Sequence, residues 1–259
     1  MSKLDTPYHR LPDYSVLIDR LYQIRAAVNS EHEDLGKTIR ECRSDDARLT
    51  AIGHIGQLLD STILILTFIH RHLLPLDGPW WDEVYKAPFA PFDTRNKSIL
   101  INNLTVGFAK VAFIQNLFSI IDSSVRIFLR AIEPTKEPPM KFSDAFKRLK
   151  GKLAPLPPDS DDLLTLLART RNIVHNNGVY FFPNKADETL EFKGRSYEFK
   201  YGQPIKYVTW EWLIERVPEV LLVLNHVVRD PRILEIEYIH DPFVLRPQEA
   251  NRSEEGVID

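Results

Sequence analysis

Cysteine is nearly absent from this sequence, because its 259 residues include only Cys42. One thiol cannot form a disulfide within the chain, and cysteine-ligated structural zinc sites normally use at least two thiolates. The sequence also lacks a glycine-rich phosphate loop, a serine nucleophile elbow and a tandem Cys/His pattern. We therefore expect a protein of a reducing compartment that holds no metal and no other cofactor.

Long uninterrupted apolar runs are also missing. Residues 1–10 are polar, so no signal peptide is expected. The two most apolar stretches, residues 61–74 and 99–132, are interrupted by charged and polar side chains. Neither provides the roughly 20 apolar residues in a row that a membrane span needs. The sequence thus predicts a cytoplasmic protein without a membrane partner.

Neither sign of charge dominates. Lys and Arg number 33 against 36 Asp and Glu, which gives a net charge of -3. This balance argues against a strongly basic protein that coats nucleic acids non-specifically, but it permits a local basic patch. Within the basic stretch 136–152, the residues Lys147, Arg148 and Lys150 are candidates for binding phosphates. The alternative is an ordinary solvated surface.

Apolar residues recur at helical spacing through most of the chain, which predicts a mainly α protein. Capping residues and prolines bound the expected helices, as at Pro134 and at the Asn-Asn-Gly of residues 176–178. Further apolar residues at Leu35 and Ile39 indicate either a continuation of the first helix or a second short one. The expected helices cover residues 13–28, 46–74, 99–133, 142–149, 159–175 and 209–228.

Two segments depart from the helical pattern. Residues 76–97 combine prolines with tryptophans and phenylalanines, which predicts an aromatic loop packed over the bundle. Apolar and charged residues alternate within residues 188–207, which predicts a β-hairpin with Gly194 at its turn. The predicted fold is therefore a helical bundle with a small β-hairpin inserted before the last long helix. One domain would span residues 1–246, followed by a disordered tail, 247–259.

Polar residues gather where the helix 159–175 ends, in the sequence RTRNIVHNNG of residues 169–178. On a regular helix, Arg171 and His175 lie about 40° apart and can address one substrate. Arg169 lies about 120° from His175, and we expect it to face solvent. An alternative interpretation is an ordinary helix end, in which cations and the Asn-Gly cap satisfy the last carbonyl groups.

The central helix carries one narrow polar stripe on an otherwise apolar surface. Its members are Gln115, Ser119, Asp122, Arg126 and Arg130. Burying a carboxylate or a guanidinium is costly unless the group is paired. We therefore expect Asp122 and Arg126 to bond each other or polar groups of a facing helix, for which the helix 159–175 is a candidate. A purely structural ion pair is the alternative.

The segment Arg171-Asn172-Ile-Val-His175-Asn-Asn-Gly, together with an acidic residue and an arginine on a preceding apolar helix, resembles the HEPN family. These are all-helical nucleotide-binding and ribonuclease domains of prokaryotic toxin and defence systems. In that family an arginine directly followed by a polar residue, and a histidine after four to six intervening residues, form a metal-independent ribonuclease site, commonly at a dimer interface. Here Arg171 leaves three residues before His175, and Arg169 leaves five.

The resemblance implies a role for each of these side chains. His175 would exchange a proton with a ribose 2′-hydroxyl or a leaving 5′-oxygen. Arg171 would stabilise charge on the scissile phosphate, and Asn172 would position it. The supporting residues would be Asp122, which orients Arg171 or His175, and Arg126 and Asn176. One histidine does not easily serve as both acid and base, so a homodimer is expected. RNA and a protein antitoxin or regulator would be the partners.

Two other hypotheses remain open. The chain could be a catalytically inactive HEPN-like module that binds a nucleotide or a protein, or a helical scaffold whose aromatic loop and hairpin bind a protein. The active and inactive hypotheses differ in whether His175 is exposed in a basic cleft or locked under the hairpin. His54 and His226 lie in apolar surroundings and are expected to be core or boundary residues.

Overall fold

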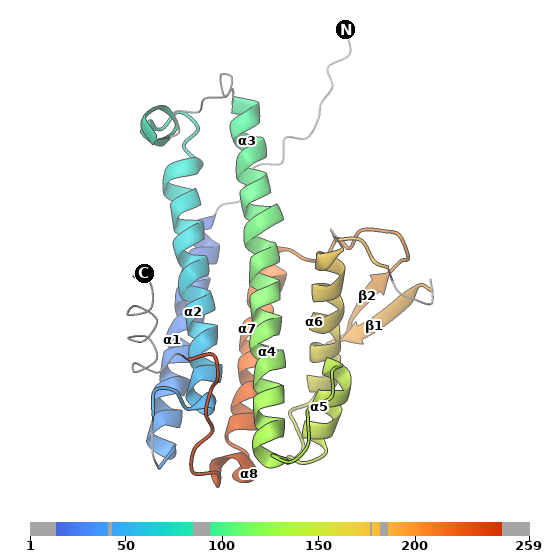
Figure 1. Ribbon diagram of the computed structural model, residues 1–259. Coiled ribbons are helices and arrows are strands. Elements are labelled where there is room, and N and C mark those ends of the chain that lie inside the picture. Colours follow the sequence, from blue (N-terminus) through green and yellow to red (C-terminus); the bar gives the residue numbers. More distant parts are fainter. Residues whose placement is uncertain (1–13, 41–42, 85–93, 177, 182–185, 245–259) are drawn as a thin grey trace, which may run out of the picture.

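The computed structural model describes residues 14–40, 43–84, 94–176, 178–181 and 186–244. Its four longest helices lie side by side as a bundle (Figure 1). They are α1 (Tyr14–Thr38), α2 (Ala47–Phe68), α4 (Val111–Ile132) and α7 (Trp210–Val228). Two shorter helices, α5 (Phe142–Lys150) and α6 (Ser160–His175), pack against α4 on the side away from α2.

Helix α4 occupies the centre of the fold because apolar side chains cover most of its circumference. It contacts α2, α5, α6 and α7, and side chains such as Ile114, Leu117 and Phe128 are fully buried. A helix that is apolar on most sides gains hydrophobic free energy only when neighbours surround it. The polar stripe on α4 therefore marks the side where the helix reaches solvent.

Helix α2 and the helix leading into α4 extend together beyond the other helices as an arm (Figure 1). Helix α2 continues into a π-helical segment, η1 (Ile69–Leu73), which a second π-helical turn, η2 (Trp80–Val84), follows. Helix α3 (Thr94–Asn102) and the π-helical η3 (Asn103–Lys110) run without a break into α4.

Two helical stretches are long and apolar enough to cross a membrane, Ala47–Leu73 and Asn96–Ile132. About half of the most apolar window of each, 50% and 47%, is buried inside the protein. Core helices of soluble proteins have the same length and composition, so two such helices are weak evidence for a membrane.

The hairpin consists of β1 (Glu188–Phe192) and β2 (Arg195–Phe199), paired antiparallel with Leu190 opposite Tyr197. Its two-residue turn, Lys193–Gly194, has φ angles of 49° and 70°. A type I′ turn requires positive φ at both positions, which glycine adopts without strain. Alternate side chains of both strands are buried, and the hairpin packs against α6 and the beginning of α7.

The segment that follows α8 (Pro231–Leu234) folds over the first turn of α2. Arg48 is only 1% exposed, and its guanidinium forms two bonds to the fully buried carboxylate of Asp46, at 2.9 and 2.6 Å. The same guanidinium donates to carbonyl oxygens of residues 233–237. Since Asp46 also caps α2 by accepting the backbone N–H of Arg48, this cluster joins the first turn of α2 to the segment that follows the start of α8.

The predicted fold class is confirmed, since a helical bundle carries a hairpin directly before its last long helix. Of the two alternatives left open for the first helix, the structure has the continuation, which runs unbroken to Thr38. Two boundaries differ from the prediction. The predicted loop 76–97 is already helical from Thr94, and the second strand ends at Phe199 because the chain turns at residues 200–203. Residues 85–93 of the loop and the predicted tail lie outside the described residues.

Candidate functional site

Helix α6 ends where the sequence predicted. The backbone N–H groups of Asn176 and Gly178 both donate to the carbonyl oxygen of Ile173, at 2.9 and 3.0 Å, and Gly178 has a φ of 80°. Glycine suits this left-handed conformation at a helix C-terminus. The cap makes His175 the last helical residue, with an exposed side chain. The side chain of Asn176 is exposed too, and only its backbone takes part in the cap.

Arg171, Asn172 and His175 occupy the last two turns of α6, where Arg171 is half-buried beside α4 and the side chains of Asn172 and His175 are exposed. Nη1 of Arg171 donates to Oδ1 of Asn172 at 3.0 Å, and its guanidinium lies 5.7 Å from the ring centre of Phe118 on α4. Among the described residues, no carboxylate pairs with Arg171 and no hydrogen bond engages His175. Both side chains are therefore available to an anion.

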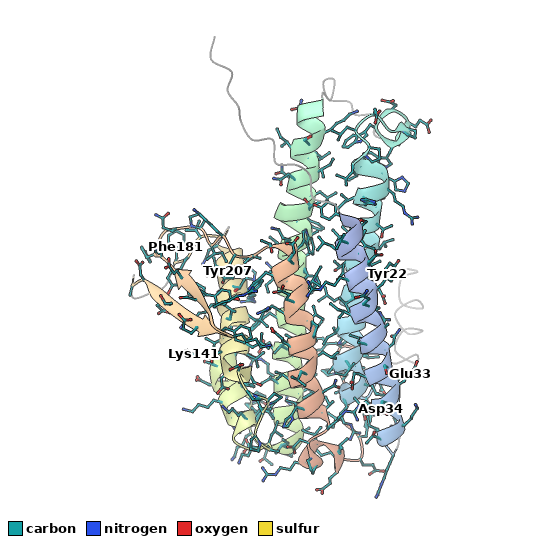
Figure 2. All side chains as sticks on the ribbon, turned by 180° about the vertical axis from the view of Figure 1, so that it is seen from behind. Tyr22, Glu33, Asp34, Lys141, Phe181 and Tyr207 are labelled. Atoms are coloured by element: carbon teal, nitrogen blue, oxygen red, sulfur yellow. The ribbon has the colours of Figure 1, made fainter. Side chains whose placement is uncertain are left out.

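The prediction that Arg169 faces solvent is wrong. Its guanidinium pairs with the carboxylate of Glu188 on β1 at 2.5 Å and lies 5.5 Å from the ring centre of Phe199. The hairpin covers this side of α6, which helical spacing alone does not reveal. The next residue, Thr170, shares a 2.8 Å hydrogen bond with the hydroxyl of Tyr207, and burial raises the pKa of Tyr207 (Figure 2). Arg169 and Thr170 thus fix α6 to the hairpin and to the segment before α7.

The predicted ion pair on α4 is confirmed. Nε of Arg126 donates to Oδ1 of Asp122 at 2.8 Å, and its other nitrogens donate to two carbonyl oxygens of the loop between α4 and α5, at 2.6 and 2.8 Å. Within the described part of the chain, no bond joins Asp122 to Arg171 or His175. The pair therefore holds the loop, and the geometry gives no support to the expectation that Asp122 orients either residue.

Ion pairs already engage two of the three cations expected to bind phosphates. Arg148 donates to the carboxylate of Glu133 at 2.6 Å, and Lys150 pairs with Asp161. Lys147 is exposed and has no acidic partner among the described residues. Glu133 also pairs with a lysine on either side of α5, so three cations share this one carboxylate and the stretch keeps net positive charge. Of the three candidates, Lys147 alone has no carboxylate partner among the described residues.

Glu133 supplies a prediction about acid stability. The hydrogen bond from Arg148 holds the pKa of the Glu133 carboxyl below its ordinary value of 4.5. Its pairing therefore contributes stability that is complete above that value and is lost as the pH falls through the lower folded-state pKa. We expect Glu133→Gln to be less stable than wild type near neutral pH, and its free energy of unfolding to fall less on acidification. Urea unfolding at several pH values measures both, and parallel pH profiles for the two proteins would contradict the prediction.

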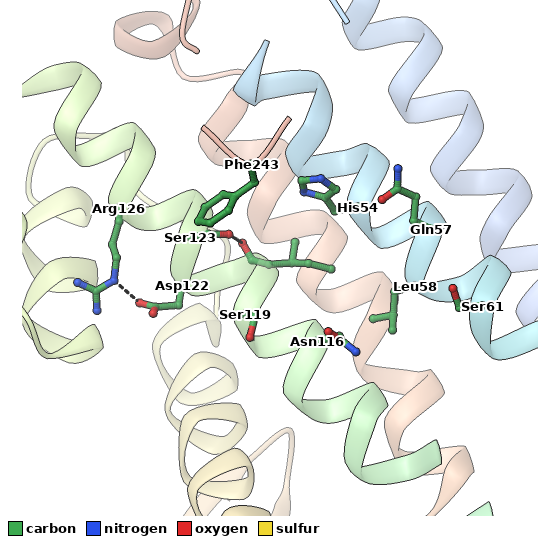
Figure 3. Close-up of a pocket in the computed structure, with 11 residues that line it drawn as sticks. His54, Gln57, Leu58, Ser61, Asn116, Ser119, Asp122, Ser123, Arg126 and Phe243 are labelled. Atoms are coloured by element: carbon green, nitrogen blue, oxygen red, sulfur yellow. Dashed lines mark hydrogen bonds and ion pairs between the residues drawn. The ribbon is translucent and has the colours of Figure 1, made fainter. Parts of the chain in front are cut away.

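A groove of about 580 Å³ between α2 and α4 was not predicted from the sequence (Figure 3). Its polar lining consists of His54, Gln57 and Ser61 from α2, and of Asn116, Ser119, Asp122, Ser123 and Arg126 from α4. The sequence does carry a signal for this groove, because polar residues recur at intervals of three and four positions on both of these apolar helices. His54 is half-buried, as expected for a boundary residue, but it lines this groove and has no hydrogen-bond partner among the described residues.

Within the described ranges, no three His, Cys, Asp or Glu side chains converge as ligands for a metal ion. Comparison with protein-family models, curated proteins and solved structures finds no match to this chain. The resemblance to HEPN domains therefore rests on the residues at the end of α6 and on the helical layout.

Proposed function

We propose that this chain is a HEPN-like cytoplasmic protein that binds RNA at the C-terminal end of α6 and cleaves it without a metal ion. The observation that supports the proposal is a contrast along α6. Arg169 is committed to Glu188, whereas Arg171, Asn172 and His175 lie together without an acidic partner among the described residues. A guanidinium that no carboxylate compensates gains most from binding a phosphate.

The proposed chemistry assigns one task to each side chain. His175 takes the proton from a ribose 2′-hydroxyl, the 2′-oxygen attacks the neighbouring phosphorus, and the bond from phosphorus to the 5′-oxygen breaks. The products are a 2′,3′-cyclic phosphate and a 5′-hydroxyl that receives a proton from a second acid. Arg171 binds the phosphate oxygens as their negative charge grows. Asn172 holds the guanidinium of Arg171 in place through their hydrogen bond.

A second copy of the chain would supply the second acid. Each chain offers one histidine at this helix end, and the exposed position of His175 leaves it accessible to a symmetry-related copy. We therefore propose a homodimer in which two α6 ends face each other. A protein antitoxin or other regulator would silence such a site by covering the same helix ends.

A catalytically inactive module that binds RNA or protein is the second candidate. Arg169, which has the longer five-residue spacing to His175, is occupied by Glu188 and the ring of Phe199. Cations near a helix C-terminus also stabilise the helix without any ligand. If the reaction requires an arginine five residues before His175, the pairing of Arg169 with Glu188 favours RNA binding without cleavage.

The decisive experiment incubates purified protein with mixed-sequence RNA in EDTA and analyses the fragment ends by mass spectrometry. We expect fragments that end in a 2′,3′-cyclic phosphate, and a solution mass of twice the 30.0 kDa of one chain. Saturable RNA binding without cleavage would support the binding module. Neither binding nor cleavage would contradict the ribonuclease and the RNA-binding module, and would leave a module that binds protein.

A further inference from the structure

The groove between α2 and α4 is built from neutral groups that can donate and accept hydrogen bonds. The exposed amides of Gln57 and Asn116 stand on opposite walls. The hydroxyl of Ser61 follows Gln57 along α2, and those of Ser119 and Ser123 follow Asn116 along α4 (Figure 3). An amide offers both a donor and an acceptor, and a hydroxyl can act as either. The walls therefore suit a ligand whose edge alternates donors and acceptors.

The charged groups of the groove compensate one another. Asp122 and Arg126 are paired at 2.8 Å, and the remaining guanidinium nitrogens of Arg126 are engaged by backbone carbonyl groups. His54 is the one other titratable side chain among the described residues that line the groove. A phosphate would find no uncompensated arginine or lysine among the groove lining, so the groove fits a neutral base and its ribose better than a phosphate group.

An aromatic ring stands at the mouth of the groove. Phe243 is 70% exposed, although its backbone is held in a hydrogen-bonded turn. The carboxylate of Asp241, only 2% exposed, accepts the N–H of Phe243 at 2.9 Å and also the hydroxyl of Thr50 on α2. The groove is also lined by the apolar side chains of Leu58 and Ile120, and the exposed ring of Phe243 offers a face on which a flat ligand can stack.

A buried donor without an acceptor lies at the other end of the groove. A narrow recess of about 70 Å³ shares Leu58, Ser61 and Asn116 with the groove and is lined by Trp210 of α7. Trp210 is 5% exposed, and its Nε1–H has no hydrogen-bond partner among the described residues. Buried indole N–H groups normally find a partner, so an acceptor atom of a bound molecule would satisfy this one.

We propose that the α2–α4 groove binds an adenine base, presented by a free nucleoside or by a nucleotide of RNA. The amide of an asparagine or glutamine can pair with the donor N6 and the acceptor N7 of adenine at the same time. Phe243 stacks on the base, and the serine hydroxyls bind the ribose. The volume of the groove, about 580 Å³, lies within the usual range for small-molecule sites.

This inference does not depend on RNA cleavage at the end of α6. The groove and the α6 end lie on opposite sides of α4, since α2 and α6 flank that helix on either side (Figure 1). The groove lining includes none of Arg171, Asn172 and His175. Adenine binding can therefore fail while cleavage succeeds, and the reverse can also occur.

The test titrates the full chain with adenosine, and with uridine as the comparison, by calorimetry and by NMR of the tryptophan indole N–H groups. We expect saturable binding of adenosine, at least about tenfold weaker binding of uridine, and a shift of the Trp210 indole signal, which Trp210→Phe assigns. Phe243→Ala and Asn116→Leu should each weaken adenosine binding about tenfold or more. Both side chains are exposed, so thermal unfolding should be close to that of wild type.

Phe181→Ala is the matched control, because Phe181 is an exposed phenylalanine beside the hairpin, 53% accessible and far from the groove (Figure 2). It should bind adenosine as wild type does. No saturable adenosine binding, equal binding of uridine, or full binding by both groove variants would overturn the proposal.

A further titration distinguishes the two sources of the base. If the groove reads a base within RNA, a short oligoadenylate should bind more tightly than adenosine and lose the same factor in Phe243→Ala. If a free nucleoside is the ligand, Phe243→Ala should leave the binding of the oligoadenylate unchanged.

Discussion

We expect His175→Ala to cleave RNA at least about 100-fold more slowly than wild type in the presence of EDTA. A positioned acid or base contributes this much because proton transfer accompanies both formation of the bond from the 2′-oxygen and loss of the 5′-oxygen. The side chain is exposed and forms no hydrogen bond to any described residue, so its removal should change the free energy of unfolding little. The RNA cleavage rate of chromatographically pure protein tests the predicted loss of activity, and a thermal unfolding curve tests the predicted unchanged stability.

His72→Ala provides the matched control for this experiment. His72 is also exposed and also near a helix end, but it lies at the tip of the arm. Its removal should leave the cleavage rate unchanged. Arg171→Met should lose activity as His175→Ala does, whereas equal rates in wild type and His175→Ala would assign any cleavage to a contaminant or to another site.

The largest effect on stability is expected for Arg48→Met, which should lower the free energy of unfolding by about 3–5 kcal/mol. The substitution leaves the carboxylate of Asp46, which is 0% exposed, without its countercharge. It also removes the donor from carbonyl oxygens of residues 233–237. A buried charge that has lost its partner is costly, and a typical domain has only about 5–15 kcal/mol of stability in total.

Arg25→Met is the comparison that separates the effect of burial on an ion pair's stability from the effect of its geometry. Arg25 forms the same two-bond contact with Asp60, at 2.8 and 2.9 Å, but the two side chains are 24% and 54% exposed. Water screens this pair, so its loss should cost no more than about 1 kcal/mol. Urea unfolding of both variants gives the comparison, and similar losses for Arg25→Met and Arg48→Met would contradict the argument.

Local patterns of the sequence were sufficient for most of the secondary structure. The end of α6 was predictable because Gly178 supplies the left-handed residue that stops a helix. The hairpin was predictable because Leu190, Phe192, Tyr197 and Phe199 alternate with charged residues and are buried. Each of these signals lies within a few positions of the feature that it predicts.

The environment of the site depends on contacts between distant segments, and these could not be predicted from spacing. Arg169 was expected in solvent because its position on α6 contains no information about the hairpin that covers it. The pairing of Asp122 with Arg126 was predictable because they lie one turn apart on one helix, whereas among the described residues no bond joins Asp122 to Arg171. The groove likewise depends on how α2 and α4 pack and on the turn that places Phe243 at its mouth.

The cluster around Arg48 also constrains when the chain can fold. Its hydrogen bonds to the C-terminal segment span 185 to 189 positions of the sequence. During translation, α2 leaves the ribosome long before residues 233–237 have been made, so its first turn must wait for the carbonyl groups that accept from Arg48. Contacts of such long range form late and leave apolar surface exposed in the meantime. Nascent chains that end before residue 237 lack these carbonyl groups, and they should therefore be substrates for chaperones and proteases.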